Sequence, residues 1–342
     1  MHTARLESAD SVTRTSFMSL LRQLPNVLKL RIGVSIAFAA LAGYAVAPGP
    51  ALAVWQIVVL GFAVFLSSAA AGGFNQYVER DLDQRMQRTR RRPFATGALK
   101  AHRGWLVFLY ALLALAVGAA AWALNSVAAL YVFLGAFVYA IVYTVWLKRR
   151  SWLNIVVGGL AGSFAVLAGA AAVDPHIGAR AAWFAVALFL WTPSHFWSLS
   201  IALRDDYAAA GVPMLPVVVG AHAAAWAVLG NSVLLVAASL VPLFYGLGWI
   251  YALGALAGGV WFLRENIRML GDQSRAVAMR NFLRRQGKKK FNPGSAAAMS
   301  RANERLVISS SRLNRYCSDD VLLKISSGTG LATSSNTRLV EA

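Results

Sequence analysis

The carboxylates of this chain are concentrated in two clusters within an otherwise apolar stretch. Residues 32–263 contain only six acidic residues. Five of these form the two clusters: Glu79, Asp81 and Asp83, then Asp205 and Asp206. Carboxylates beside lipid are costly and persist where they are paired, hydrated or bound to a cation. Each cluster is therefore a candidate functional site, and together they suggest one site with two acidic walls.

The spacing of the first cluster indicates a cation site. If an apolar helix continues through it, Asn75, Glu79 and Asp83 follow each other at four-residue intervals and share one face. Asp81 lies about 200° from Glu79 on such a helix, so it is expected to point elsewhere, toward Arg80 or Arg85. Clustered oxygen ligands suit a hard cation such as magnesium, which often binds together with substrate phosphates. The alternative is a solvated helix end whose carboxylates pair with neighbouring arginines.

A basic run follows the first cluster, over residues 85–93. The forked guanidinium group of arginine matches phosphate oxygens, so acidic residues with magnesium and arginines together could hold a diphosphate from two sides. A basic loop is also what membrane orientation requires, and such loops attract anionic lipids. The run by itself therefore leaves both interpretations open.

The elements that must position these residues are membrane helices. The chain is 58% hydrophobic and 14% charged, and several apolar runs approach the roughly 20 residues that a membrane helix needs. We predict an N-terminal segment at 1–30, a transmembrane domain at 31–265 and a basic, mostly disordered tail at 266–342, with a short helix near 295–307. The predicted spans are Ile32 to Ala47, Ala51 to Phe74, Trp105 to Leu124, Val127 to Leu147, Trp152 to Val173, Ala181 to Leu203, Ala223 to Leu240 and Val241 to Leu263.

The distribution of basic residues predicts the orientation of these eight spans. With both termini cytoplasmic, 32 of the 33 Lys and Arg residues fall on the cytoplasmic side, and Arg180 is the exception. This asymmetry agrees with the positive-inside rule. Short connectors predict that successive helices are antiparallel neighbours. Both acidic clusters then lie at the same membrane face.

Several stretches resemble a known family. Residues 75–83 are similar to the Asn-x-x-x-Asp-x-x-x-Asp signature of the UbiA-type intramembrane prenyltransferases, with Glu79 in place of the first aspartate. The motif at 88–93 resembles the protohaem IX farnesyltransferase branch, also called haem O synthase. Three further motifs resemble that branch in order and spacing: Tyr143-Thr144-x-Trp146-Leu147-Lys148-Arg149-Arg150, Asn154-Ile155-Val156-x-Gly158-Gly159, and Trp191-Thr192-Pro193-x-His195-Phe196-Trp197 leading into Asp206-Tyr207-x-x-Ala210-Gly211-Val212-Pro213-Met214-Leu215-Pro216.

The resemblance implies a helical bundle around a central cavity and an enzyme that transfers a farnesyl group from farnesyl diphosphate to a vinyl group of protohaem IX. By resemblance, the ligands of magnesium-diphosphate are Asn75, Glu79, Asp83 and Asp206. The candidate substrate-binding residues are Arg88, Arg92, Lys148, Asp205, Tyr207 and Tyr143. The implied setting is a bacterial inner membrane, or the mitochondrial inner membrane in a eukaryote. Implied partners are haem A synthase or oxidase assembly factors, and no nucleic acid.

His195 is a further catalytic candidate because it lies about two helical turns before the second cluster. A histidine there could ligate haem iron, bind a haem propionate or assist the addition of water to a vinyl-derived cation. The alternative is a hydrogen bond to a neighbouring helix. The residues leave these roles open.

The C-terminal part departs from the family pattern. The family usually has nine membrane helices, whereas the sequence after Arg264 is too polar for a ninth. It could be a genuine basic tail that binds anionic headgroups, or unrelated sequence from a shifted reading frame. Two other functions stay open: a prenyltransferase for an aromatic or quinone-precursor acceptor, and a cation- or proton-coupled transporter, although the internal repeats common in transporters are not evident.

Overall fold

The fold is a bundle of long helices, seen in a computed structural model that describes residues 21–283. All described residues lie in helices or in the turns between them. The elements are α2 (Leu30–Val46), α3 (Val54–Val78), α4 (Arg80–Arg85), α5 (Pro93–Thr96), α6 (Arg103–Ala123), α7 (Ser126–Phe137), η1 (Val138–Leu147), α8 (Asn154–Val173), α9 (Ala179–Ala202), α10 (Arg204–Ala209), α11 (Leu215–Val219), α12 (Ala221–Leu240), η2 (Val241–Tyr245), α13 (Trp249–Gly271) and α14 (Arg275–Leu283).

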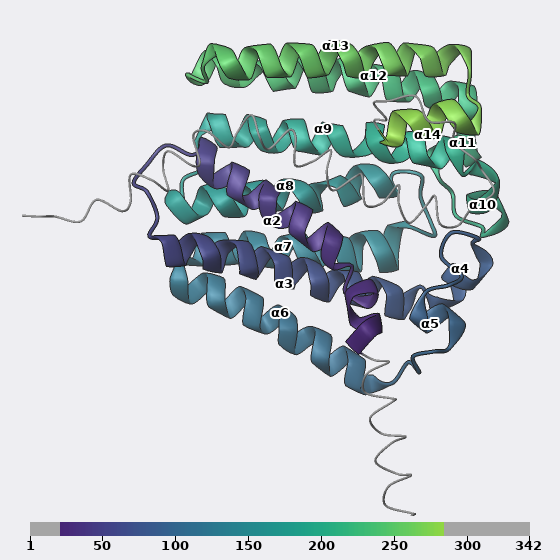
Figure 1. Cartoon of the computed structure of the whole chain (residues 1–342), viewed down its shortest axis with the longest axis horizontal. Coiled ribbons are helices and arrows are strands. Elements are labelled where there is room, and N and C mark those ends of the chain that lie inside the picture. The colour runs from purple at the N-terminus through teal and green to yellow at the C-terminus, as the bar shows by residue number, and fades with distance from the viewer. Residues whose placement is uncertain (1–20, 284–342) are drawn as a thin grey trace, which may run out of the picture.

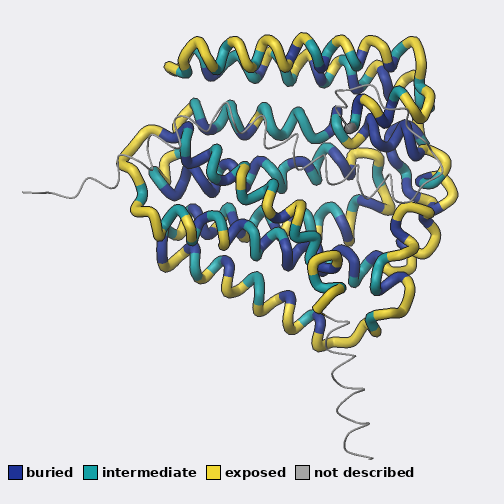
Figure 2. The backbone as a smooth tube through the Cα atoms, in the orientation of Figure 1, coloured by how far each residue is buried: buried dark blue, intermediate teal, exposed yellow. Residues whose placement is uncertain are grey.

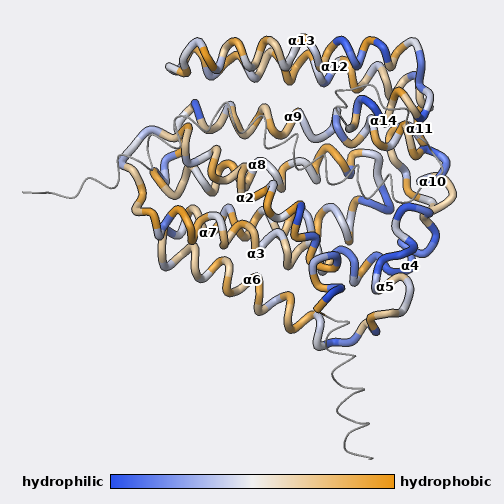
Figure 3. Tube along the Cα trace, in the orientation of Figure 1, coloured by the Kyte–Doolittle hydropathy of each residue, from blue (hydrophilic) through white to orange (hydrophobic). Residues whose placement is uncertain are grey.

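Successive long helices run in alternating directions, as their short connectors predicted (Figure 1). The helices α12 and α13 form one outer side of the bundle, α6 lies at the opposite side, and the other long helices lie between them. The short helices α4, α5, α10, α11 and α14 gather at one end. Figure 3 shows that hydrophilic residues are concentrated at that same end, which we call the polar end.

Each predicted span corresponds to one long helical stretch in the described part of the chain. Within residues 21–283, six helices are long and apolar enough to cross a membrane, and a seventh candidate is α2 together with the short helix Leu21–Val27, bent by 50°. The eighth stretch, α13, does not meet this criterion, and its second half carries Arg264, Glu265 and Arg268. The predicted start of this stretch at Val241 was wrong, because residues 241–245 extend α12 as the 3-10 helix η2.

The turn after η2 is fixed by Arg180, the basic residue outside the predicted cytoplasmic side. Its guanidinium group donates two hydrogen bonds to the carbonyl of Tyr245, at 3.1 and 2.7 Å. The next residue, Gly246, has a left-handed backbone (φ 88°) that favours glycine. The chain turns at this glycine, and the following helix starts at Trp249.

The centre of the bundle is built on small residues where α2 crosses α8. A Cβ atom at Gly169 would lie 1.8 Å from the carbonyl oxygen of Ala40, and one at Gly43 would lie 2.0 Å from the carbonyl oxygen of Val166. The two backbones can approach this closely only because both positions are glycine. Burial is highest along α3, α8 and α9, whereas α6, α12 and α13 expose much of their outer surface (Figure 2). That exposed surface includes large apolar side chains such as Val107 and Val260, as expected beside lipid.

The helical bundle extends beyond the predicted boundary at residue 265. Helix α13 continues to Gly271, and α14 folds back against α9. The polar sequence is misleading because only part of each turn is exposed: Asn266 and Met269 of α13, and Ala278, Met279 and Asn281 of α14, are buried. The predicted short helix at 295–307 and the rest of the tail lie outside the described residues.

Candidate functional site

The first acidic cluster sits where α3 ends and α4 begins. Glu79 breaks the helix (φ −89°, ψ 10°), yet its N–H still donates to the carbonyl of Asn75, and the N–H of Asp83 donates to the carbonyl of Glu79. The four-residue spacing inferred from the sequence therefore survives the break. The side chains of Asn75, Glu79 and Asp83 are almost fully buried, at 1–2% exposure. They lie at the polar end, where a buried carboxylate needs a counter-charge.

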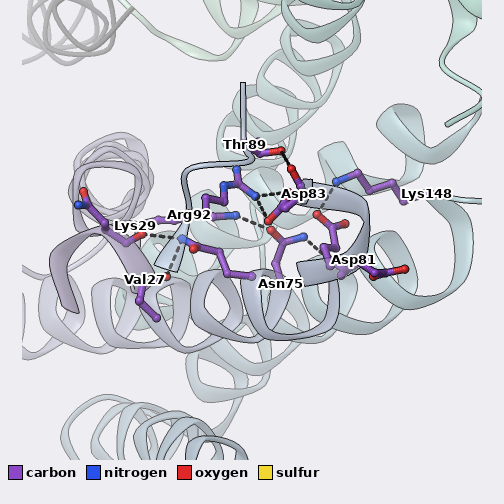
Figure 4. A network of polar contacts seen from close by, with 12 residues as sticks. Val27, Lys29, Asn75, Asp81, Asp83, Thr89, Arg92 and Lys148 are labelled. Carbon is purple, nitrogen blue, oxygen red and sulfur yellow. Dashed lines mark hydrogen bonds and ion pairs between the residues drawn. The ribbon is translucent and has the colours of Figure 1, made fainter. Parts of the chain in front are cut away.

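Two basic residues supply this counter-charge. The ammonium group of Lys148 lies 2.5 Å from Glu79 Oε2, and one guanidinium nitrogen of Arg92 lies 2.9 and 2.8 Å from the two carboxylate oxygens of Asp83. Figure 4 shows Arg92 with Asp83 near Asn75, and Lys148 close by. Lys148 and Arg92 were predicted to contact phosphate, and here each contacts a carboxylate of the predicted magnesium site. Lys148 is 69 residues from Glu79 in the sequence, so only the fold brings this pair together, whereas Arg92 follows Asp83 by nine residues.

Lys29 is a site residue that sequence reasoning did not single out. It lies at the bend before α2 and is the one non-glycine residue among residues 21–283 with a positive φ, 50°. Its ammonium group donates to Asn75 Oδ1 at 2.5 Å (Figure 4) and to the hydroxyl of Tyr139 at 2.9 Å. A left-handed lysine is strained, and such strain clusters at functional sites. In the sequence, Lys29 counted only as one more basic residue near a membrane helix.

The cluster is completed by the π-helical segment η1 at the end of the fourth predicted span. The Thr144 hydroxyl donates to the carbonyl of Tyr139, and the N–H of Lys148 donates to the carbonyl of Tyr143, each five residues back. Thr144 Oγ1 also accepts a hydrogen bond from Asn75 Nδ2 at 3.0 Å. Wide turns of this kind are frequent at functional sites. Tyr139 was not singled out from the sequence, and Thr144 was named only as part of the motif that begins at Tyr143, because an apolar run gives no signal for a π-helix.

The motif at 154–159 has a packing role in the structure. A Cβ atom at Gly158 would lie 2.9 Å from the ring of Tyr143, and one at Gly159 would lie 3.1 Å from Thr192 Cβ. The glycines therefore let α8 approach both η1 and α9. The ring of Tyr143 also stacks on that of Tyr139, with centroids 5.6 Å apart. The lysine nitrogen atoms lie over these rings: Lys148 Nζ is 5.7 Å from the centroid of the Tyr143 ring, and Lys29 Nζ is 5.5 Å from that of Tyr139.

The second acidic cluster contacts the loop that follows the first. Asp206 on α10 is half-buried, and its Oδ1 accepts a hydrogen bond from the backbone N–H of Gln87 at 2.8 Å. Asp205 is exposed. The structure thus places the two clusters at the same end of the bundle, where the Asp206 carboxylate bonds to the loop after α4.

Arg88 lies between the two clusters. It is within electrostatic range of Tyr207 on α10, of Tyr143 on η1 and of Asp83. Tyr207 is buried and Arg88 is exposed. Three of the predicted substrate-binding residues therefore lie near one another and near the buried carboxylates.

Asp81 belongs to a separate, exposed pair. Arg149 donates two hydrogen bonds to its carboxylate, at 3.0 and 2.8 Å. The predicted partners Arg80 and Arg85 were wrong: Arg80 instead donates to the carbonyl of Tyr77. The hydrogen bonds from Arg149 hold the pKa of Asp81 below its ordinary value, and they outweigh the opposing effect of partial burial. This pair lies beside the site and joins α4 to the end of η1.

His195 lies in the second half of α9, where its ring contacts other aromatic side chains. Its ring is stacked between the rings of Trp191 and Phe282, with both centroid distances 4.3 Å. Phe196 meets the same ring edge-on at 5.5 Å. The structure therefore gives His195 an aromatic environment that includes a residue of α14.

The oxygen atoms of the first cluster suit magnesium, and Lys148 and Arg92 pair with two of its carboxylates. Among the described residues, no three His, Cys, Asp or Glu side chains form a group that could hold a metal ion as they stand. Glu79 Oε1, however, is buried without a hydrogen-bond partner. A buried carboxylate oxygen with no partner is costly, and a hard cation would satisfy it. Glu79, Asn75 and Asp83 thus fit a cation that takes its other ligands from a substrate.

Comparison with known sequences identifies relatives over most of the chain. Residues 36–285 match the UbiA prenyltransferase family. A protein from Paramagnetospirillum magneticum named protoheme IX farnesyltransferase 2 is 53% identical over 262 residues, which cover 77% of this chain and 91% of that protein. A protoheme IX farnesyltransferase of Thermus thermophilus is 37% identical over 277 residues, 80% of this chain and 45% of that protein.

The fold matches solved structures of the same family at low sequence identity. A UbiA homologue from Archaeoglobus fulgidus, bound to DMAPP and Mg2+, has a TM-score of 0.65 and 16% identity, and the match covers 88% of this chain and 99% of that one. A homologue from Aeropyrum pernix K1 without ligand has a TM-score of 0.62 at 20% identity, over 86% and 97% of the two chains. These likenesses agree with the helical bundle described above. This chain is a multi-pass membrane protein and belongs to the UbiA prenyltransferase family.

Proposed function

We propose that this protein transfers the farnesyl group of farnesyl diphosphate to a vinyl group of protohaem IX, releasing diphosphate and forming haem O. The relatives named protoheme IX farnesyltransferase support this substrate pair. The observation that carries the proposal is the buried cluster of Asn75, Glu79 and Asp83, paired with bases from other segments at one end of an apolar bundle. Such a site can bind a diphosphate while the farnesyl chain lies among apolar side chains.

The basic residues are proposed to bind the leaving group. Negative charge develops on the diphosphate as the bond between farnesyl C1 and oxygen breaks, and preorganised cations stabilise that charge. Lys148 and Arg92 already lie at the carboxylates, and Arg88 lies beside Tyr207 and Tyr143. Binding of a diphosphate with its cation lets these bases exchange a carboxylate partner for phosphate oxygens. Asp205 and Tyr207 are proposed to line the same region from α10.

Magnesium is the proposed partner of the acidic residues, with Asn75, Glu79, Asp83 and Asp206 as its ligands. When bound, it would neutralise charge on the diphosphate and assist its departure. The unpaired Glu79 Oε1 supports this assignment. Glu79 has one methylene more than the aspartate of the family signature, and it lies at the helix break.

The acceptor reaction forms a carbon–carbon bond and then takes up water. Farnesyl C1 bonds to the terminal carbon of the vinyl group, which leaves a cation on the carbon attached to the macrocycle. Water adds to that carbon and loses a proton, which gives the hydroxyethylfarnesyl side chain. His195 is the proposed acceptor-side residue, because an imidazole can take this proton near neutral pH. The proposed location is a bacterial inner membrane, with the polar end cytoplasmic.

The test is an assay on membranes that contain this chain. They are incubated with protohaem, farnesyl diphosphate and magnesium, and the extracted haem is analysed by mass. We expect a product heavier than protohaem by one farnesyl group and one hydroxyl group, and no product when magnesium is chelated. A parallel reaction replaces protohaem with an aromatic quinone precursor. Absence of farnesylated haem, with folded protein and a working relative as positive control, would overturn the proposal.

A further inference from the structure

The ring of His195 is covered on both faces by aromatic side chains. Trp191, one turn earlier on α9, stacks on one face with an interplanar angle of 16°. Phe282 of α14 stacks on the same ring with an interplanar angle of 29°. Both centroid distances are 4.3 Å, at the short end of the range for aromatic pairs. A ring enclosed in this way presents only its edge, and both nitrogen atoms lie on that edge.

Phe282 reaches this position because a buried polar chain fixes α14. Asn281 Nδ2 donates to Asn266 Oδ1 of α13 at 2.6 Å, and Asn266 Nδ2 donates to Ser232 Oγ of α12 at 2.7 Å. Ser232 Oγ donates in turn to Ser194 Oγ of α9 at 2.9 Å. All four residues are buried, at 0–3% exposure. The chain starts next to Phe282 and ends next to His195.

These contacts specify more than the attachment of α14 to the bundle. Apolar packing would hold α14 against α9 without fixing its rotation, because it is not directional. Hydrogen bonds between buried amides and hydroxyls do fix rotation, since an unpaired group there is costly. One rotation of α14 directs Asn281 to α13 and Phe282 to His195. The polar chain and the aromatic stack therefore act as one device.

We propose that α14 completes the acceptor side of the site, and that Phe282 is a positioning residue that holds the imidazole of His195 in one orientation. This inference rests on the proposed function only in taking His195 as the base that acts on the acceptor side. With both ring faces covered, His195 does not stack on a flat acceptor and acts through a ring nitrogen. That is the geometry required to take a proton from the water that adds to the vinyl-derived cation.

The first test measures the chemical reactivity of the His195 imidazole, and it does not require enzymatic turnover. Purified protein in detergent is treated with diethyl pyrocarbonate, and the modified histidines are identified by peptide mass spectrometry. His176, whose side chain is 97% exposed, is the internal reference. The energy of one stacked aromatic pair corresponds to a change of about threefold to tenfold in an equilibrium constant. We therefore expect Phe282→Leu to raise the rate at which His195 is modified by about that factor. Phe282→Tyr keeps the aromatic ring, so its His195 should be modified at the same rate as in the original protein.

Phe196→Leu is the matched control, because Phe196 contacts the same imidazole at its edge and not its face. We expect it to change the modification rate of His195 by less than about twofold, since a T-shaped partner at longer range restricts the ring less. Thermal midpoints of all variants are compared, so that a general loss of folding is distinguished from a local change at His195.

The second test asks whether Phe282 acts through His195 during turnover. We expect Phe282→Leu to lower the turnover rate with protohaem and to leave the KM for farnesyl diphosphate unchanged. In a His195→Gln background the same substitution should have no further effect, because coupled residues are not additive.

An unchanged modification rate in Phe282→Leu, an equal effect of Phe196→Leu, or full additivity with His195→Gln would each overturn the inference. If the unmodified protein makes no farnesylated haem while the reactivity of His195 still follows Phe282, the proposed function fails and the positioning role stands.

Discussion

Two buried polar networks hold the bundle together, and they are built from different chemistry. The network at the end of α3 is charged: Glu79 with Lys148, Asp83 with Arg92, and Lys29 on Asn75. The network between α9, α12, α13 and α14 contains only amides and hydroxyls. Both link segments distant in the sequence. The neutral network is buried throughout, whereas Arg92 and Lys29 of the charged network are partly exposed.

The difference indicates which network serves chemistry. Buried ion pairs cost desolvation energy and are often no better for stability than apolar residues of the same size. Neutral hydrogen bonds fix helix positions at lower cost. A bundle that needed only to be held together would use the second kind throughout. The charged network is therefore best explained by a charged ligand, and breaking each network should have a different consequence.

The largest expected effect is the loss of turnover on removing one charge from the first network. Asp83→Asn keeps the size of the side chain and removes the charge that balances Arg92. Loss of one preorganised electrostatic contact at a reacting group lowers rates by about 10²- to 10³-fold. The measurement is the yield of farnesylated haem per folded protein, with Asp81→Asn as the matched control. A variant Asp83→Asn that keeps more than a tenth of the activity would contradict the assignment.

Variants of the ion pair between Glu79 and Lys148 should affect stability and turnover differently. Lys148→Met alone leaves a buried carboxylate without its counter-charge, which costs about 3 to 5 kcal/mol. Adding Glu79→Gln removes that carboxylate charge, and most of the lost stability should return. Turnover should stay lost in the double variant, since both proposed ligand groups are gone. Thermal midpoints and product yields check the two halves of this prediction, and a double variant with normal turnover would refute it.

The neutral network predicts a moderate loss of stability and an indirect effect on turnover. Ser232→Ala leaves Asn266 Nδ2 without its acceptor and should lower the free energy of unfolding by about 1 to 3 kcal/mol. Ser200→Ala is the control, because the buried Ser200 hydroxyl donates only to the carbonyl of Phe196 in its own helix. Denaturation in detergent compares the two variants. Equal stability would show that the network is not what holds α12 and α13 together.

The smallest effect is expected at the exposed pair of Asp81 and Arg149. The pKa of Asp81 is lowered below its ordinary 3.8, so the pair stabilises the folded state above that value. This stabilisation disappears as the pH falls through the lowered pKa and Asp81 becomes protonated. The difference in thermal midpoint between the original protein and Asp81→Asn should therefore be present at neutral pH and shrink below pH 3.8. A difference that grows on acidification would contradict this sign.

Much of the fold follows from sequence patterns because membrane helices obey few rules. Apolar run length and basic-residue asymmetry located the spans, although they placed the start of α13 at Val241 instead of Trp249. The boundary at residue 265 was misplaced because a helix with one exposed polar face resembles a tail in composition. The face shared by Asn75, Glu79 and Asp83 was predictable because helical spacing is local, and the break at Glu79 preserved it.

The sequence by itself determined the class of protein, the order of the helices and the acidic residues that carry charge in an apolar setting. These depend on composition and short-range periodicity, which the chain displays directly. Only the tertiary structure decided that Lys29 contacts Asn75, that Arg149 and not Arg80 pairs with Asp81, and that Phe282 covers His195. These partners are 46, 68 and 87 residues apart in the chain, and no local pattern specifies which distant side chains meet when the helices pack.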